Sequence, residues 1–125
     1  MILSGIDRAL LQSPVYGDVD AQCEINFWYN KKGGSLNTIR LNVLVPNPQG
    51  GWDRSRLWAV TANSQATSDW QNAVVSIGAR KAGFKLEFEA LKLISAGTMA
   101  VDDVTFNKCA VGMFSITIFY ALRVF

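Results

Sequence analysis

The sequence predicts an all-β fold, either a sandwich or a barrel. Apolar residues recur with a period of two in several segments, which is the pattern of strands with one buried face. Turn-forming residues separate these segments, and no longer stretch carries the 3.6-residue apolar stripe of a helix. With 125 residues, 50% of them hydrophobic, the chain is long enough for one domain with its own core.

Alternation is clearest in three segments. In residues 25–29 the aromatic and aliphatic side chains share one face, and residues 39–45 repeat this pattern. Pro46 ends the second segment because it has no backbone N–H for a strand ladder. Residues 84–89 alternate apolar and charged without exception, so we expect their charged face to lie in water. Turn-forming residues follow or separate these strands at 31–35, 46–51, 63–65 and 95–97.

Charge and composition exclude several classes of function. Twelve Lys and Arg against ten Asp and Glu give a net charge of +2, and the basic residues are scattered, so we expect no nucleic-acid partner. The chain has no histidine, which excludes Ser-His-Asp, Cys-His and His-zinc chemistry. We therefore expect no enzymatic activity and no cofactor. The N-terminus has no basic segment before its short apolar run, so the chain as given shows no signal peptide.

Two cysteines, Cys23 and Cys109, lie near the two ends of the strand pattern. They are too few for an all-cysteine zinc site and too far apart for a CxxC redox motif. The residues alone leave two interpretations open, a disulfide that stabilises the fold or two reduced thiols in the core.

Four residues are candidates for an interaction surface. Trp28 lies between two inward-facing aromatic residues, so alternation places it on the opposite strand face. Trp52 and Arg54 lie in a glycine-containing segment that we expect to be a loop, and Arg56 follows closely. An aromatic residue beside arginines suits a binding surface, although such a loop can equally fold over the edge of its own sandwich.

The adjacent carboxylates Asp102 and Asp103 are candidates for a structural cation site. If Val104 and its alternating apolar neighbours face the core, Asp102 faces it too and Asp103 points outward, so the two cannot act together on one glycosidic bond. An inward carboxylate needs partners. Backbone N–H groups or an arginine such as Arg40 or Arg80 would satisfy it, and a Ca²⁺ ion is the alternative.

These motifs together resemble the MAM domain, the adhesion and interaction module of meprins, neuropilins and adhesive receptor tyrosine phosphatases. The order and spacing of the matching segments hold over about a hundred residues, and the two segments that contain the cysteines are the most specific. The matching segments are A-L-L-Q-S-P at 9–14, C-E-I-N-F-W-Y-N-K-K-G at 23–33, the tryptophan segments 57–58 and 70–73, F-K-L-E-F-E at 84–89, and A-V-D-D-V-T-F-N-K-C at 100–109.

The resemblance implies a jelly-roll β-sandwich of two antiparallel sheets over residues 9–109. It also implies that Cys23 and Cys109 form the second disulfide of the family. The opening region of the family, with its first cysteine pair, has no counterpart before Ala9, so we expect an N-terminally incomplete domain. The implied function is a non-catalytic, extracellular or cell-surface module that binds proteins in a homophilic or heterophilic manner.

A carbohydrate-binding jelly roll is the alternative function. Sugar binding of that type requires exposed aromatic rings that converge on one face, and the sequence offers Trp28, Trp52 and Tyr16 without showing that they converge.

The apolar C-terminal tail, residues 110–125, has three interpretations. It is a last strand, because residues 114–118 alternate, or the start of a membrane helix, or an unnatural end of the gene model. A membrane association would then come only through this tail or through a parent protein.

Overall fold

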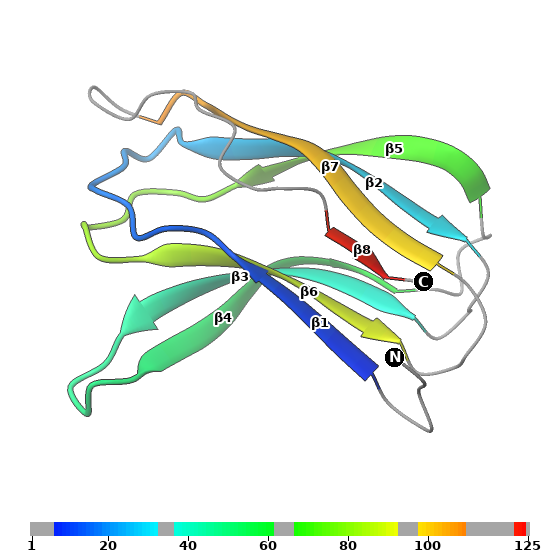
Figure 1. Cartoon of the computed structure of the whole chain (residues 1–125). Coiled ribbons are helices and arrows are strands. Elements are labelled where there is room, and N and C mark those ends of the chain that lie inside the picture. The colour runs from blue at the N-terminus through cyan, green and yellow to red at the C-terminus, as the bar shows by residue number, and fades with distance from the viewer. Residues whose placement is uncertain (1–6, 33–36, 62–66, 93–97, 110–121, 125) are drawn as a thin grey trace.

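The computed structural model describes residues 7–32, 37–61, 67–92, 98–109 and 122–124. These residues form eight strands in two antiparallel four-stranded sheets that lie one above the other (Figure 1). The strands are β1 (Asp7–Gln12), β2 (Glu24–Lys32), β3 (Thr38–Pro46), β4 (Trp52–Val60), β5 (Thr67–Ser76), β6 (Lys85–Lys92), β7 (Thr98–Asn107) and β8 (Leu122–Val124).

The chain winds back and forth between the two sheets. One sheet has the strand order β1-β6-β3-β4 and the other has the order β5-β2-β7-β8. The connections β3–β4 and β7–β8 stay within one sheet, whereas the remaining connections cross to the other sheet. This arrangement is a jelly-roll β-sandwich, which confirms the predicted fold class.

The three alternating segments are strands, as predicted. Residues 25–29 lie in β2, residues 39–45 lie in β3, and residues 85–89 open β6. Trp52 differs from the expectation, because it is the first residue of β4 rather than the tip of a loop. The first half of β4 is exposed on both faces at the edge of its sheet, so its residues carry no apolar alternation that would have predicted a strand.

The core lies between the two sheets and contains a cluster of aromatic rings. Phe27 from β2 packs edge to face against Phe88 of β6 at 4.9 Å and against Trp58 of β4 at 5.0 Å, measured between ring centroids. Tyr16 packs between Phe84 and Phe106, and burial raises its pKa to about 12. The predicted inward faces therefore meet across the sandwich.

A disulfide joins Cys23, directly before β2, to Cys109, shortly after β7. Both cysteines are buried, and 86 positions of sequence separate them. The bond therefore closes most of the described chain into a covalent loop next to the pairing of β2 with β7. This confirms the pairing implied by the resemblance and rules out two reduced thiols.

A β-bulge in β7 corrects the orientation that we expected for Asp102. Val101 and Val104 are both buried in the core although they are three residues apart. The register with β2 shifts at this point, and Asp103 has a positive φ of 54°. Because the bulge inserts one residue into the alternation, Asp102 pairs with Trp28 on the outer face instead of facing the core.

The interpretations of the C-terminal tail stay predictions. Residues 114–118, whose alternation suggested a last strand, lie outside the described residues. Leu122–Val124 is described as strand β8 and pairs with Met99 to Val101 of β7. In the described part of the chain, no helix has the length and apolarity needed to cross a membrane.

Candidate functional site

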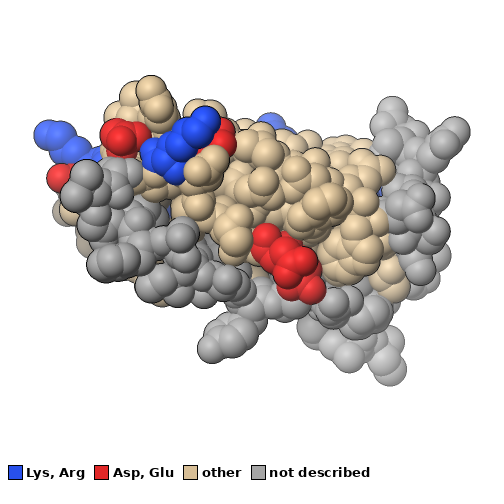
Figure 2. Space-filling view, turned by 90° about the horizontal axis from the view of Figure 1, so that it is seen from above, with Lys and Arg blue, Asp and Glu red and all other residues tan. Residues whose placement is uncertain are grey.

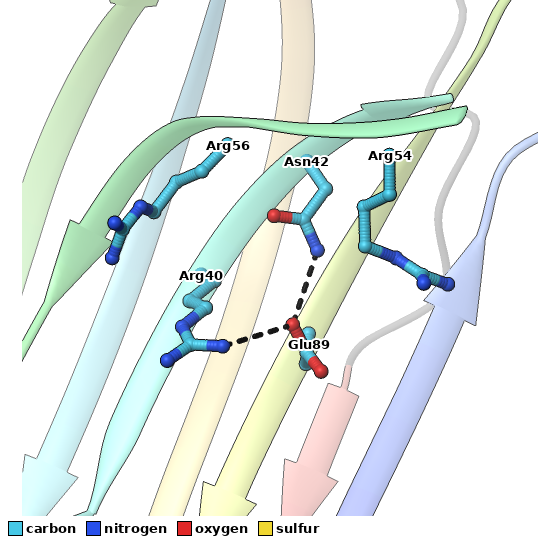
Figure 3. Close-up of a pocket in the computed structure, with 5 residues that line it drawn as sticks. All are labelled: Arg40, Asn42, Arg54, Arg56 and Glu89. Atoms are coloured by element: carbon cyan, nitrogen blue, oxygen red, sulfur yellow. Dashed lines mark hydrogen bonds and ion pairs between the residues drawn. The ribbon is translucent and has the colours of Figure 1, made fainter. Parts of the chain in front are cut away.

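The outer face of the sheet β1-β6-β3-β4 carries a cluster of arginine, asparagine and glutamate side chains. The register of the sheet creates it, because Arg40 pairs with Glu89, and Asn42 pairs with Arg56 on one side and Glu87 on the other. The result is an open hollow of about 240 Å³. We call it the arginine hollow; it is lined by Arg40, Asn42, Arg54, Arg56 and Glu89 (Figure 3).

Glu87 is the anchor of the cluster. Its side chain is fully buried on the outer face because other side chains cover it, which corrects the expectation that this face of the strand lies in water. Arg54 binds the carboxylate through Nε at 2.6 Å and Nη2 at 3.0 Å. The side-chain amides of Asn42 and Gln12 donate further hydrogen bonds at 3.0 and 2.7 Å. Burial alone would raise the pKa of Glu87, but these hydrogen bonds outweigh it and hold the pKa below its usual value.

Glu89, two residues further along β6, is also buried and also bound by several donors. Arg8 of β1 forms an ion pair with Oε2 at 2.8 Å. On the other carboxylate oxygen, Asn42 donates a hydrogen bond at 3.2 Å and the Nη1 atom of Arg40 lies at 3.7 Å. Both buried carboxylates of the cluster are therefore satisfied by groups of the same face.

The arginines of the hollow are less completely satisfied than the carboxylates. Among the described residues, Arg40 makes only the long ion pair with Glu89, and its buried Nε has no acceptor. Arg56 is exposed and makes no ion pair or hydrogen bond within the part of the chain that the structure describes. In Figure 3 these two arginines lie on one side of Asn42 and Glu89, and Arg54 lies on the other. The hollow thus has an excess of positive charge and of unused N–H donors.

Trp52 lies on the same outer face, two residues before Arg54 on β4. Its indole ring is half-exposed, and the Nζ atom of Lys85 from β6 lies 4.4 Å from the ring centroid. A cation at this distance from a tryptophan ring makes a favourable contact. This contact leaves the ring partly covered by a charged group and extends the positive charge of the face beyond the hollow.

The outer face of the opposite sheet carries exposed apolar side chains among polar ones such as Asn26 and Asn72, which are hydrogen-bonded to each other. Trp28 on β2 pairs with Asn72 on β5, and alternation places Val74 on the same side of β5. Trp70 lies two residues before Asn72, where the register between β2 and β5 becomes irregular. Trp28, Trp70 and Val74 are 41%, 40% and 52% exposed, respectively. We call this surface, centred on Trp28, Trp70 and Val74, the tryptophan face. Figure 2 looks onto this sheet from above and shows a broad uncharged surface that contains a small acidic group.

The predicted interaction residues therefore fall on two separate surfaces. Trp52, Arg54 and Arg56 share the outer face of one sheet, and Trp28 lies on the outer face of the other sheet. The three aromatic residues of the carbohydrate-binding alternative do not converge either, because Tyr16 packs in the core between the sheets. An aromatic platform for sugar stacking is thus not formed by Trp28, Trp52 and Tyr16.

Asp102 and Asp103 lie at the bulge of β7, beside the tryptophan face. The backbone N–H of Asp103 donates a hydrogen bond to Oδ1 of Asp102 at 2.8 Å, which is one of the backbone partners expected for this carboxylate. Arg40 contacts Glu89 instead, and Arg80 donates to the carbonyl oxygen of Ile77. Among the described residues no group of three or more Cys, Asp or Glu side chains is placed to hold a metal ion. The structural Ca²⁺ ion stays a prediction.

Sequence reasoning missed the acidic half of the arginine hollow. The i, i+2 spacing of Glu87 and Glu89 indicates a shared face, as does the spacing of Arg54 and Arg56. No feature of the sequence shows that β3 lies between β4 and β6 and so brings these pairs together.

A comparison with protein-family models matches residues 3–110 of the chain to the model described as "MAM domain, meprin/A5/mu". The match spans the described strands from β1 to β7 and both cysteines of the disulfide.

Proposed function

The chain belongs to the MAM domain family, and on this basis we propose that it is a non-catalytic, extracellular protein-binding module that makes its contact through the tryptophan face. MAM domains as a family are adhesion-type modules in the extracellular parts of secreted or membrane proteins. The complete absence of histidine from the sequence supports a binding role over a catalytic one.

The exposed apolar cluster of Trp28, Trp70 and Val74 is the observation that carries the proposal. Exposed large apolar side chains that lie together, rather than singly, are typical of interaction sites. Tryptophan in particular contributes strongly to binding energy at the centre of protein interfaces. The sheet beneath holds these side chains at fixed spacing, so a partner would meet a preformed surface.

Acidic groups beside this face support a partner with basic side chains at the corresponding positions. Asp102 pairs with Trp28 across the strands, and Glu24 lies on the same side of β2 by alternation. A complementary surface would carry apolar side chains in its centre and Lys or Arg at its border. The partner is therefore a protein surface of that composition, on a second copy of the chain or on another protein.

Bead adhesion tests this proposal. Beads coated with the disulfide-bonded protein are scored for aggregation with each other and for attachment to cells that naturally produce the chain. We expect adhesion in at least one of the two assays. Trp28→Ala should reduce it at least tenfold, and Val15→Ala, at an exposed apolar residue outside this face, should leave it unchanged.

Two results would contradict the proposal. If wild-type beads adhere in neither assay, protein binding is wrong. If they adhere and Trp28→Ala does not reduce adhesion, the placement of the binding surface on the tryptophan face is wrong. Equal melting temperatures of Trp28→Ala and wild type show that a loss of adhesion is not caused by unfolding.

A further inference from the structure

We propose that the arginine hollow is a second binding site, separate from the tryptophan face, and that it binds the sulfate groups of a sulfated polysaccharide. The hollow lies on the outer face of the sheet β1-β6-β3-β4, so both surfaces can be occupied at the same time.

The charges of the hollow and its border favour an anionic ligand. Four arginines, Arg8, Arg40, Arg54 and Arg56, surround two carboxylates, those of Glu87 and Glu89. Two of the arginines are used to hold these carboxylates, since Arg54 binds Glu87 bidentately and Arg8 binds Glu89 at 2.8 Å. The positive charge of the other two is left largely uncompensated.

The two remaining arginines have the donors that an oxyanion needs. Arg56 is exposed and makes no ion pair or hydrogen bond in the described part of the chain. Arg40 is half-exposed; among the described residues its only ion pair is 3.7 Å long and its Nε has no acceptor. Guanidinium groups bind sulfate and carboxylate oxygens through paired N–H donors, so an anion seated between these side chains would satisfy both.

The site requires no rearrangement of the buried network beneath it. The Glu87 carboxylate accepts hydrogen bonds from Arg54, Asn42 and Gln12, and Glu89 is bound by Arg8 and Asn42. These contacts hold the floor of the hollow in place without Arg56. The floor of the hollow is therefore preorganised, and binding of an anion has to order only the side chains of Arg40 and Arg56.

The distribution of polar and apolar groups favours a polysaccharide over an acidic protein segment. Every residue that lines the hollow is polar or charged, whereas protein interfaces are usually anchored by buried apolar side chains. The cations that have no close ion pair among the described residues are also spread over three neighbouring strands, with Arg56 on β4, Arg40 on β3 and Lys85 on β6. A polymer with regularly repeated sulfates can contact several of them at once, and this multivalency strengthens binding.

Retention on immobilised heparin oligosaccharides at physiological ionic strength tests the inference. We expect micromolar binding by the wild-type protein, about tenfold weaker binding by Arg56→Ala, and a larger loss in Arg40→Ala/Arg56→Ala, since each lost charged hydrogen bond weakens binding by at least that factor. The control variant Lys81→Ala/Lys108→Ala also removes two positive charges, from exposed positions outside β3 and β4, and should bind like wild type.

Competition experiments distinguish the chemistry of the ligand. Soluble heparin oligosaccharide should displace the protein, whereas inorganic sulfate at equal sulfate concentration and a poly-glutamate peptide should be much weaker competitors. The inference is overturned by an absence of retention, by an equal loss in the Lys81/Lys108 control, or by poly-glutamate competing as well as heparin. The Arg56 side chain is exposed and makes no ion pair or hydrogen bond among the residues that the structure describes, so Arg56→Ala remains a valid test if the double variant is unstable.

Discussion

Arg54 and Glu87 form a bidentate ion pair on the outer face of one sheet, with Nε–Oε1 and Nη2–Oε2 distances of 2.6 and 3.0 Å. The glutamate side chain is fully buried and the arginine side chain is 40% exposed, so the arginine covers the carboxylate and shields it from water. The pair joins β4, at the edge of the sheet, to β6, two strands away. It therefore fixes the edge strand that carries Arg56.

Removing the carboxylate of this pair should destabilise the protein. In Glu87→Ala the side chains of Arg54, Asn42 and Gln12 lose their shared acceptor. We expect the free energy of unfolding to fall by about 2 to 3 kcal/mol, measured by chemical denaturation. Arg56→Ala is the matched control on the same face and should change it by less than about 0.5 kcal/mol. If the free energy of unfolding falls equally in the two variants, Glu87 does not anchor the cluster.

The low pKa of Glu87 predicts how stability depends on pH. Because hydrogen bonds hold its pKa in the folded protein below the unfolded value of about 4.3, the carboxylate stabilises the fold above that pH. This stabilisation is lost as the pH falls through the folded pKa. Denaturant unfolding between pH 7 and pH 3 should therefore show a steeper acid loss for wild type than for Glu87→Gln. If the stability of both proteins falls in parallel with pH, Glu87 is not the carboxylate that causes the acid loss.

The disulfide should contribute a large part of the stability. In the chain-entropy model, a bond that closes a loop of 86 residues stabilises the fold by about 4.6 kcal/mol. Cys23→Ala/Cys109→Ala should lower the free energy of unfolding by an amount of this order. Reductant should destabilise the wild type and leave the double variant unaffected. A count of free thiols in the native protein should give zero, and two reactive thiols would contradict the pairing.

The bulge in β7 predicts that substitutions of Asp103 change the stability of the protein more than its exposed position suggests. A residue with a φ of 54° is strained unless it is Gly, Asn or Asp, and β-branched residues tolerate this region least. Asp103→Val should cost about 1 to 2 kcal/mol of stability, although the side chain is exposed, and Asp103→Gly should cost little. Thr105→Val, on the same strand with an exposed side chain, is the control that should be neutral. If the two valine variants lower the stability equally, the assignment of the bulge to Asp103 is wrong.

Much of the fold follows from local patterns in the sequence. Strict alternation in 84–89 and 39–45 is sufficient to predict β6 and β3, because a half-buried strand imposes a period of two. The motifs around Cys23 and Cys109 are sufficient to predict the disulfide through the family resemblance. The strands depend on residues that are close in sequence, whereas the pairing of two cysteines 86 positions apart is predicted only through the family motifs around them.

The candidate sites depend on features that local patterns do not contain. Alternation places Glu87 on an outer face, but its burial results from Arg54, which reaches it across β3. The orientation of Asp102 depends on a bulge of one residue, and a single insertion reverses every inference from alternation beyond it. The separation of Trp28 from Trp52 depends on which strands belong to which sheet.

A crossed comparison of two variants with two ligands tests most directly whether the two outer faces bind different partners. Trp28→Ala and Arg56→Ala, which alter opposite sheets, are each measured for bead adhesion and for retention on heparin oligosaccharides. We expect Trp28→Ala to lose adhesion and keep heparin retention, and Arg56→Ala to keep adhesion and bind heparin about tenfold more weakly. If each variant lowers both activities, or if neither variant changes either one, the assignment of separate functions to the two faces is wrong.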